Sequence, residues 1–154
     1  MWEESHAGGC LCGRLRYRVR RIESAYWCHC TMCRRASGSG ALPWLTVARA
    51  DFEVTAGTPA LFSSSPGVTR LFCGHCGSPI LFDMAKEAAV DVTVGTLDDP
   101  DAVAPTHHIW TQSALEMTAG LGTGLPRHEA EREEANGVET TPKETPGGES
   151  ADRA

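Results

Sequence analysis

Residues 27 to 40 read Trp27-Cys28-His29-Cys30-Thr31-Met32-Cys33-Arg34-Arg35-Ala36-Ser37-Gly38-Ser39-Gly40. Cys28, Cys30 and Cys33 lie within six residues, which is too crowded for three side chains to pack apart in a hydrophobic core. They suit one metal ion instead, because zinc and other soft cations draw thiolates into a single tetrahedron with metal–sulfur distances of about 2.3 Å. The stretch therefore predicts a loop that binds zinc through three thiolates.

Three ligands leave a fourth coordination position on a tetrahedral ion. In catalytic zinc sites that position holds water or substrate, whereas structural sites fill all four positions with protein side chains. His29 and His75 are the alternatives for a fourth protein ligand. Because His29 lies between two ligands, we expect its side chain to point away from the ion that they share. We therefore expect an open site.

The other four cysteines form two pairs, Cys10 with Cys12 and Cys73 with Cys76. Both pairs lie in turns flanked by glycine, which gives the backbone the freedom to approach sulfur. Together they predict a closed four-thiolate zinc site that joins distant segments and stabilises the fold. In the alternative division, Cys10 and Cys12 share an ion with the first two cysteines of the triplet, which splits a compact triplet between two ions.

The composition limits the class of protein. The chain has 154 residues and 41% hydrophobic content, which is enough for one domain with a core. Its apolar runs are shorter than the roughly 18 residues that cross a membrane, and residues 1–6 do not resemble a secretory signal. We therefore expect a cytoplasmic protein with reduced cysteines. The net charge of -6 argues against non-specific nucleic-acid binding.

Short segments of strand character alternate with turns rich in glycine and proline, and helical periodicity is nearly absent, so the sequence predicts an all-β fold. Cys73 and Cys76 are expected at the tip of a hairpin, and Pro43 is expected to place its strand at an edge or a bulge. The expected strands are 14–19, 22–27, 41–47, 52–54, 60–63, 68–72, 80–82, 90–94 and 106–110.

The ends of the chain differ in composition from its middle. Residues 1–7 are predicted to be a disordered leader, and 8–128 to be one zinc domain. Residues 129–154 are dominated by Glu, Arg, Thr, Pro and Gly. Such a segment does not bury enough apolar surface to offset its ordering entropy, so we predict a disordered tail.

Arg34 and Arg35 directly follow the third cysteine of the triplet. A guanidinium can bind a substrate carboxylate through two parallel hydrogen bonds, or it can simply offset the charge of three thiolates. An open zinc–thiolate site also binds a further thiol and keeps it deprotonated, although a free thiol has a pKa of about 8.5. The expected substrate is therefore a thiol or a thioether-like adduct.

Several segments resemble the family of glutathione-dependent formaldehyde-activating enzymes, which has the Mss4-like β fold and includes relatives of centromere protein V. The resemblance covers about residues 8 to 128. Near residue 117, where the family often has an aromatic residue, this chain has Met117. The segments that carry the resemblance are 8–13, 28–39 and 72–80, with weaker likeness at 94–100 and 108–110.

The resemblance implies two zinc ions and an activity. It assigns a structural zinc to Cys10, Cys12, Cys73 and Cys76, and a catalytic zinc to the triplet of Cys28, Cys30 and Cys33. The implied reaction is carbon–sulfur lyase chemistry, the reversible joining of glutathione and formaldehyde into S-hydroxymethylglutathione. The competing hypothesis is a zinc-stabilised β module that binds a protein partner without catalysis.

Overall fold

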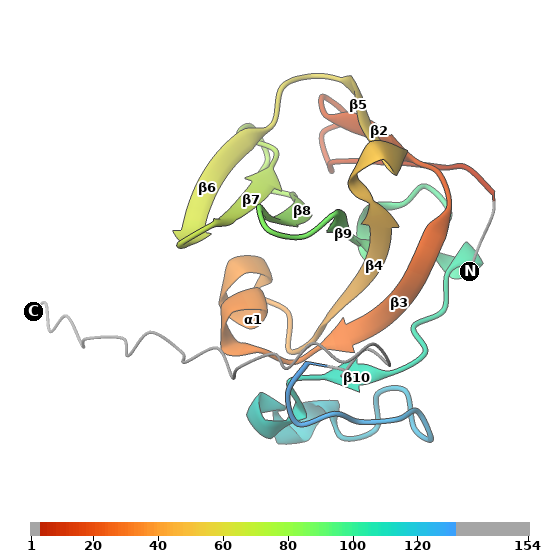
Figure 1. Cartoon of the computed structure of the whole chain (residues 1–154), viewed down its shortest axis with the longest axis vertical. Coiled ribbons are helices and arrows are strands. Elements are labelled where there is room, and N and C mark those ends of the chain that lie inside the picture. Colours follow the sequence, from red (N-terminus) through yellow and green to blue (C-terminus); the bar gives the residue numbers. More distant parts are fainter. Residues whose placement is uncertain (1–3, 132–154) are drawn as a thin grey trace, which may run out of the picture.

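A computed structural model describes residues 4–131, whose strands form two sheets (Figure 1). The smaller sheet contains, in spatial order, β1 (His6–Gly9), β2 (Arg16–Val19) and β5 (Phe52–Ala56). The larger sheet contains, in spatial order, β10 (His108–Ile109), β3 (Ile22–Cys28), β4 (Leu42–Ala48), β9 (Ala89–Thr93), β8 (Pro79–Met84), β7 (Val68–Phe72) and β6 (Ala60–Ser65). The helices are α1 (Thr31–Ser37) and the 3-10 helices η1 (Arg49–Asp51), η2 (Val94–Thr96), η3 (Pro100–Ala102), η4 (Thr111–Ser113) and η5 (Glu116–Thr118). The prediction of an all-β fold is confirmed.

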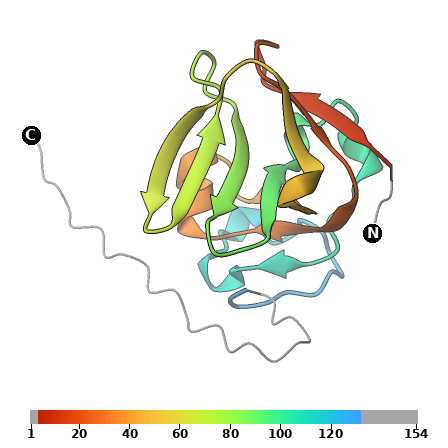
Figure 2. The same ribbon diagram turned by 45° about the horizontal axis from the view of Figure 1, so that its top comes forward.

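Each of the nine expected strands overlaps a strand of the structure. The strand pairs are antiparallel except for β10 beside β3, which are parallel. Figure 2 shows β6, β7 and β8 as a meander with α1 behind it. The turn between β7 and β8 carries Cys73 and Cys76, so the hairpin expected around this pair is confirmed.

Alternation along β4 gives the larger sheet two different faces. Leu45 and Val47 are fully buried in a core cluster that also contains Tyr17 and Val19 of the smaller sheet. Trp44 points the other way and belongs to a second cluster, which includes the three cysteines around α1. Because side chains alternate at period two, one strand serves the core on one side and α1 on the other.

Pro43 is not on an edge strand. β4 lies between β3 and β9, in the interior of the larger sheet. Pro43 pairs with Trp27 of β3, but the pairing of β4 with β9 begins only at Trp44, opposite Thr93. Proline lacks the N–H that a ladder needs, and here it occupies the end of an interior strand, where β4 has one neighbour.

The fold extends two residues beyond each predicted domain boundary. His6 and Ala7 pair with Val19 and Arg18 in β1, although residues 1–7 were expected to be disordered. At the other end, the backbone N–H of Trp110 donates to the carbonyl of Ala130 at 3.0 Å. Residues 1–3 and 132–154, which hold the rest of the leader and tail predictions, lie outside the described residues.

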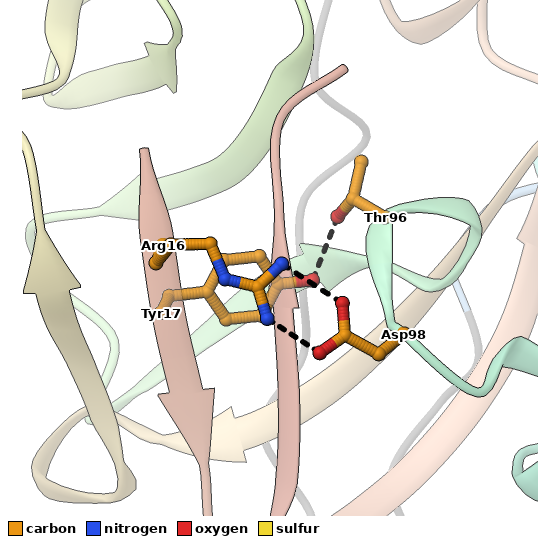
Figure 3. A network of polar contacts seen from close by, with 4 residues as sticks. All are labelled: Arg16, Tyr17, Thr96 and Asp98. Atoms are coloured by element: carbon orange, nitrogen blue, oxygen red, sulfur yellow. Dashed lines mark hydrogen bonds and ion pairs between the residues drawn. The ribbon is translucent and has the colours of Figure 1, made fainter. Parts of the chain in front are cut away.

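A polar network fastens β2 to the segment that follows β9 (Figure 3). The Arg16 guanidinium donates to both oxygens of Asp98, and the Tyr17 hydroxyl lies 2.7 Å from Oγ1 of Thr96. Gly8 packs so closely here that an added Cβ would lie 2.4 Å from the Tyr17 ring. Since β1 ends at Gly9, these contacts fix the direction in which the chain enters the turn of Cys10.

Candidate metal centres

The structure brings two distant cysteine pairs into one group. The Sγ atoms of Cys10, Cys12, Cys73 and Cys76 all lie within 4.8 Å of one another. The Cys10–Cys12 distance is 3.5 Å and the Cys12–Cys73 distance is 3.8 Å. A tetrahedral zinc ion with bonds of about 2.3 Å separates its sulfurs by roughly 3.8 Å. This donor set therefore fits one zinc ion, and we call it the four-thiolate group.

Two glycine turns place these sulfurs. Gly13 and Gly77 adopt φ angles of 75° and 79°, in the left-handed region that favours glycine. The backbone N–H of Leu15 donates to the Cys10 sulfur at 3.2 Å, and the N–H of Leu11 donates to the Ser78 hydroxyl at 3.0 Å. The turn after β1 and the tip of the β7–β8 hairpin are thus joined by a hydrogen bond as well as by the convergence of their cysteine sulfurs.

Ser78 also prepares Cys76 to be a ligand. Its hydroxyl lies 3.3 Å from the Cys76 sulfur. This hydrogen bond, with help from backbone N–H groups of Ser78 and Cys12, lowers the pKa of Cys76 to about 5. Zinc binds the thiolate form of cysteine, so hydrogen bonds that favour this form also favour metal binding near neutral pH.

The second group contains Cys28, Cys30 and Cys33, whose sulfurs also lie within 4.8 Å of one another. We call it the triplet. Cys28 ends β3, Cys30 is the N-cap of α1, and Cys33 lies in the first turn of that helix. The backbone N–H of Cys33 donates to the Cys30 sulfur at 3.2 Å. Hence strand end, cap and helix together aim three sulfurs at one point.

The loop expected at the triplet is a short helix instead. α1 spans Thr31–Ser37 and ends at Gly38, which has φ 74°. A cap by cysteine followed by helix-favouring Met, Arg and Ala explains the helix, and the left-handed glycine explains its end.

None of the helices within residues 4–131 is long and apolar enough to cross a membrane.

Neither histidine considered as a fourth ligand joins the triplet. His29 is fully buried and points to His108, with 2.8 Å between His29 Nε2 and His108 Nδ1. His75 is exposed in the turn between Cys73 and Cys76. Among the described His, Cys, Asp and Glu side chains, the group has only its three cysteines. The expectation that His29 turns away from the shared ion is confirmed.

The chemistry of the triplet fits a divalent cation. Hydrogen bonds from Cys28 and Cys33 lower the pKa of Cys30 to about 3, while hydrogen bonds with Cys30 and Cys33 raise the pKa of Cys28 well above its usual range. One thiolate at a time is therefore favoured by the protein alone, because adjacent like charges repel. A bound cation removes this conflict and allows all three sulfurs to ionise.

A row of paired residues crosses the larger sheet on the face that carries the triplet. Directly opposed residues of antiparallel strands point to the same face, and here the register aligns one residue from each of five strands. This cross-strand row consists of Thr46, Asp91, Phe82, Arg70 and Phe62. It reaches the triplet at Arg70, whose two terminal nitrogens each lie 3.8 Å from the Cys33 sulfur.

Asp91 is the acidic member of the row. The Thr46 hydroxyl donates to its Oδ1 at 2.7 Å, and Tyr26, which packs against the triplet, also lowers the pKa of this carboxyl. Burial raises the pKa of Asp91 to about 6. On this face, Phe82 is therefore flanked across the sheet by the cationic Arg70 and by the weakly acidic carboxyl of Asp91.

Among the described residues, no hydrogen bond joins the side chain of Arg34 or Arg35, the two arginines that the sequence suggested, to a sulfur of the triplet. Arg34 donates from Nη1 to the carbonyl oxygen of Ser113 at 3.3 Å, and Arg35 is exposed. Sequence reasoning missed Arg70, which was read as part of an ordinary strand. Its signal in the sequence is weak: one long cationic side chain in the short apolar segment that leads to Cys73.

Residues 5–113 match the family model described as glutathione-dependent formaldehyde-activating enzyme. The chain belongs to this family. The match includes both cysteine groups and Arg70, so the family region contains the whole candidate site. No curated protein is a significant match to the chain. A crystal structure of a Rhodobacter sphaeroides protein, a structural genomics target, aligns with a TM-score of 0.52 and 24% identity over 60% of this chain and 87% of that one, which supports the fold.

Proposed function

We propose that this member of the glutathione-dependent formaldehyde-activating enzyme family is a zinc-dependent carbon–sulfur lyase acting on glutathione adducts. Its reaction is the reversible joining of glutathione and formaldehyde into S-hydroxymethylglutathione. The observation that carries the proposal is the triplet: three converging thiols, with no fourth His, Cys, Asp or Glu ligand in the described part of the chain. An ion held there keeps a position for a substrate thiol.

The two cysteine groups have different roles in this proposal. Cys10, Cys12, Cys73 and Cys76 hold a structural zinc ion, because four thiolates complete a tetrahedron. Cys28, Cys30 and Cys33 hold the catalytic zinc ion, which supplies a Lewis-acidic centre where a thiol stays deprotonated at neutral pH. Arg35, exposed on α1, remains a proposed contact for a glutathione carboxylate, whereas Arg34 already donates to Ser113.

The seven cysteines are free thiols in the structure. Both groups need reduced sulfur to bind metal, so we place the protein in a reducing compartment such as the cytoplasm.

The alternative function, a zinc-stabilised β module that binds a protein partner, is favoured by Leu61 and Phe62. These apolar side chains are 65% and 59% exposed on β6, an edge strand of the larger sheet.

Cobalt substitution separates the two functions. Cobalt in a thiolate site has visible absorption bands that respond to a new sulfur ligand, so adding glutathione to the cobalt-loaded protein should shift and intensify the bands of the triplet. Turnover of glutathione and formaldehyde by the zinc form should accompany the shift. Bands that stay unchanged at saturating glutathione contradict the lyase and favour the partner-binding module.

A further inference from the structure

Arg70 makes the closest cationic contact with the triplet that the structure describes. Both Nη1 and Nη2 lie 3.8 Å from the Cys33 sulfur, so the forked end of the guanidinium faces one ligand atom. Hydrogen bonds to sulfur are longer than those to oxygen, and a charged donor is stronger than a neutral one. The contact joins residues 37 positions apart in the chain, so it exists only in the folded sheet.

The rest of the side chain is held by two other groups. The guanidinium lies over the Phe82 ring, 5.0 Å from its centroid, and its Nε donates to the Ser64 hydroxyl at 3.2 Å. Phe82 is directly opposite Arg70 in the register of β7 and β8. Stacking on one side and a hydrogen bond at Nε leave the two terminal nitrogens in a fixed direction, toward Cys33. Lysine has a point charge without this planar fork, and it cannot reproduce the arrangement.

The charge of the triplet explains why a cation is needed there. Three thiolates and one divalent ion carry a net charge of -1, and a substrate thiolate would change it to -2 at a site where Cys28 and Cys33 are buried. Charge in such a site is costly unless it is paired and hydrogen-bonded. A guanidinium on the Cys33 sulfur reduces the net charge by one unit.

We infer that Arg70 is a positioning residue that holds the Cys33 sulfur and offsets the negative charge added when a substrate thiolate enters the triplet site. The inference rests on the proposed function, because it concerns the binding of a thiol at the triplet. It gives Arg70 a role in the binding of the substrate sulfur, through its contact with Cys33 and through its charge. The competing role is recognition of a glutathione carboxylate, which a guanidinium also binds well.

The experiment uses two thiols of different charge. Glutathione carries carboxylates, whereas 2-mercaptoethanol offers only its sulfur and an uncharged hydroxyl. Each is titrated into the cobalt-loaded full-length protein and followed by the visible bands, for the wild type, Arg70→Gln and Arg70→Lys. Arg18→Gln is the matched control, because Arg18 is exposed on β2 in the smaller sheet. Circular dichroism and cobalt stoichiometry verify that each variant is folded and loaded.

Arg70→Gln should lower the affinity for both thiols by the same factor, about 10-fold or more. This is the change expected for losing a hydrogen bond to a charged group. Arg70→Lys should recover part of the affinity because it keeps the charge, and it also serves if Arg70→Gln does not fold. Arg18→Gln should bind both thiols like the wild type. Since no turnover is measured, the result does not depend on the rate of the reaction.

Two results overturn the inference. If Arg70→Gln weakens glutathione but leaves 2-mercaptoethanol unchanged, Arg70 binds the carboxylate and not the sulfur. If the affinity for neither thiol falls, the contact with Cys33 has no role in substrate binding. The proposed function fails differently: in that case the wild-type bands do not respond to either thiol, and the role of Arg70 fails with it.

Discussion

Asp91 is a carboxyl group whose ionisation opposes folding. Burial, with smaller contributions from Glu131 and Glu87, raises its pKa to about 6, against an unfolded value of about 3.9. The folded state therefore binds the proton more tightly than the unfolded state, and stability falls as the pH rises from about 4 to about 6. Above that range the cost is constant, at most about 3 kcal/mol for a shift of about two pKa units.

We predict that Asp91→Asn gains stability relative to the wild type as the pH rises. Urea unfolding at several pH values between 4 and 7 should show a difference in unfolding free energy that grows in favour of the variant. Comparing two proteins with the same cysteines cancels the pH dependence of zinc binding. A difference that stays constant with pH would show that Asp91 ionises normally in the folded protein.

Asp98 provides a control of opposite sign. It is exposed and paired with Arg16, and that hydrogen-bonded contact lowers its pKa. A lowered pKa contributes stability above the unfolded value and loses it as the pH falls. Asp98→Asn should therefore be less stable than the wild type at neutral pH, with a deficit that shrinks in acid. The two variants should follow opposite trends in the same series of urea experiments.

At the scale of elements, the two cysteine groups differ in what they support. The four-thiolate group joins two separate turns, whereas the triplet lies at the junction of β3 and α1. Cys30→Ser removes a triplet ligand, but serine is among the best N-cap residues, so α1 keeps its cap. Cys76→Ser opens the four-thiolate group and has no such compensation.

We therefore predict a large loss of melting temperature for Cys76→Ser and a small one for Cys30→Ser. Thermal unfolding of the zinc-loaded variants, followed by circular dichroism, measures both. Cys30→Ser should also abolish the response of the cobalt bands to glutathione. Equal losses of melting temperature in the two variants would contradict the separation into a structural and a catalytic group.

The elements that sequence patterns predict well are those with local signals. Val90–Val94 alternates, and Gly13 and Gly77 mark turns beside paired cysteines, so β9 and both cysteine turns could be predicted. α1 could not, because its seven residues are too few for a helical period and its N-cap is a cysteine, which is not among the residues that mark a helix start. Only Gly38 signals where it ends.

Non-local pairing explains the residues that were missed. Arg70 reaches Cys33 only because β7 pairs with β8 in one register, and a shift by one residue would turn its side chain to the other face. The alternation of β9 suggests that Asp91 faces solvent, yet its side chain lies on a partly buried face, beside Tyr26 and Thr46. Register is set by the assembled sheet, so these contacts have no local signature.

At the scale of the molecule, the four-thiolate group joins the two sheets. Its first pair follows β1 of the smaller sheet, and its second pair lies between β7 and β8 of the larger one. Cys12 and Cys73 are 61 positions apart, so an ion bound by this group would close a long loop. A covalent cross-link over such a loop stabilises a protein by about 4 kcal/mol in the chain-entropy model. The triplet closes no comparable loop, since its ligands are within six residues.

Stepwise removal of zinc should therefore separate the two sites. With increasing chelator, the triplet ion should leave first, because it has three protein ligands and an open position, and the fold should persist while glutathione binding is lost. The second ion should leave only with unfolding, since metal binding at the four-thiolate group is part of the folding free energy. Zinc release measured by a colorimetric chelator, beside circular dichroism of the same samples, follows both steps. If the sheets unfold with the release of the first equivalent, the two cysteine groups do not divide structure and substrate binding between them.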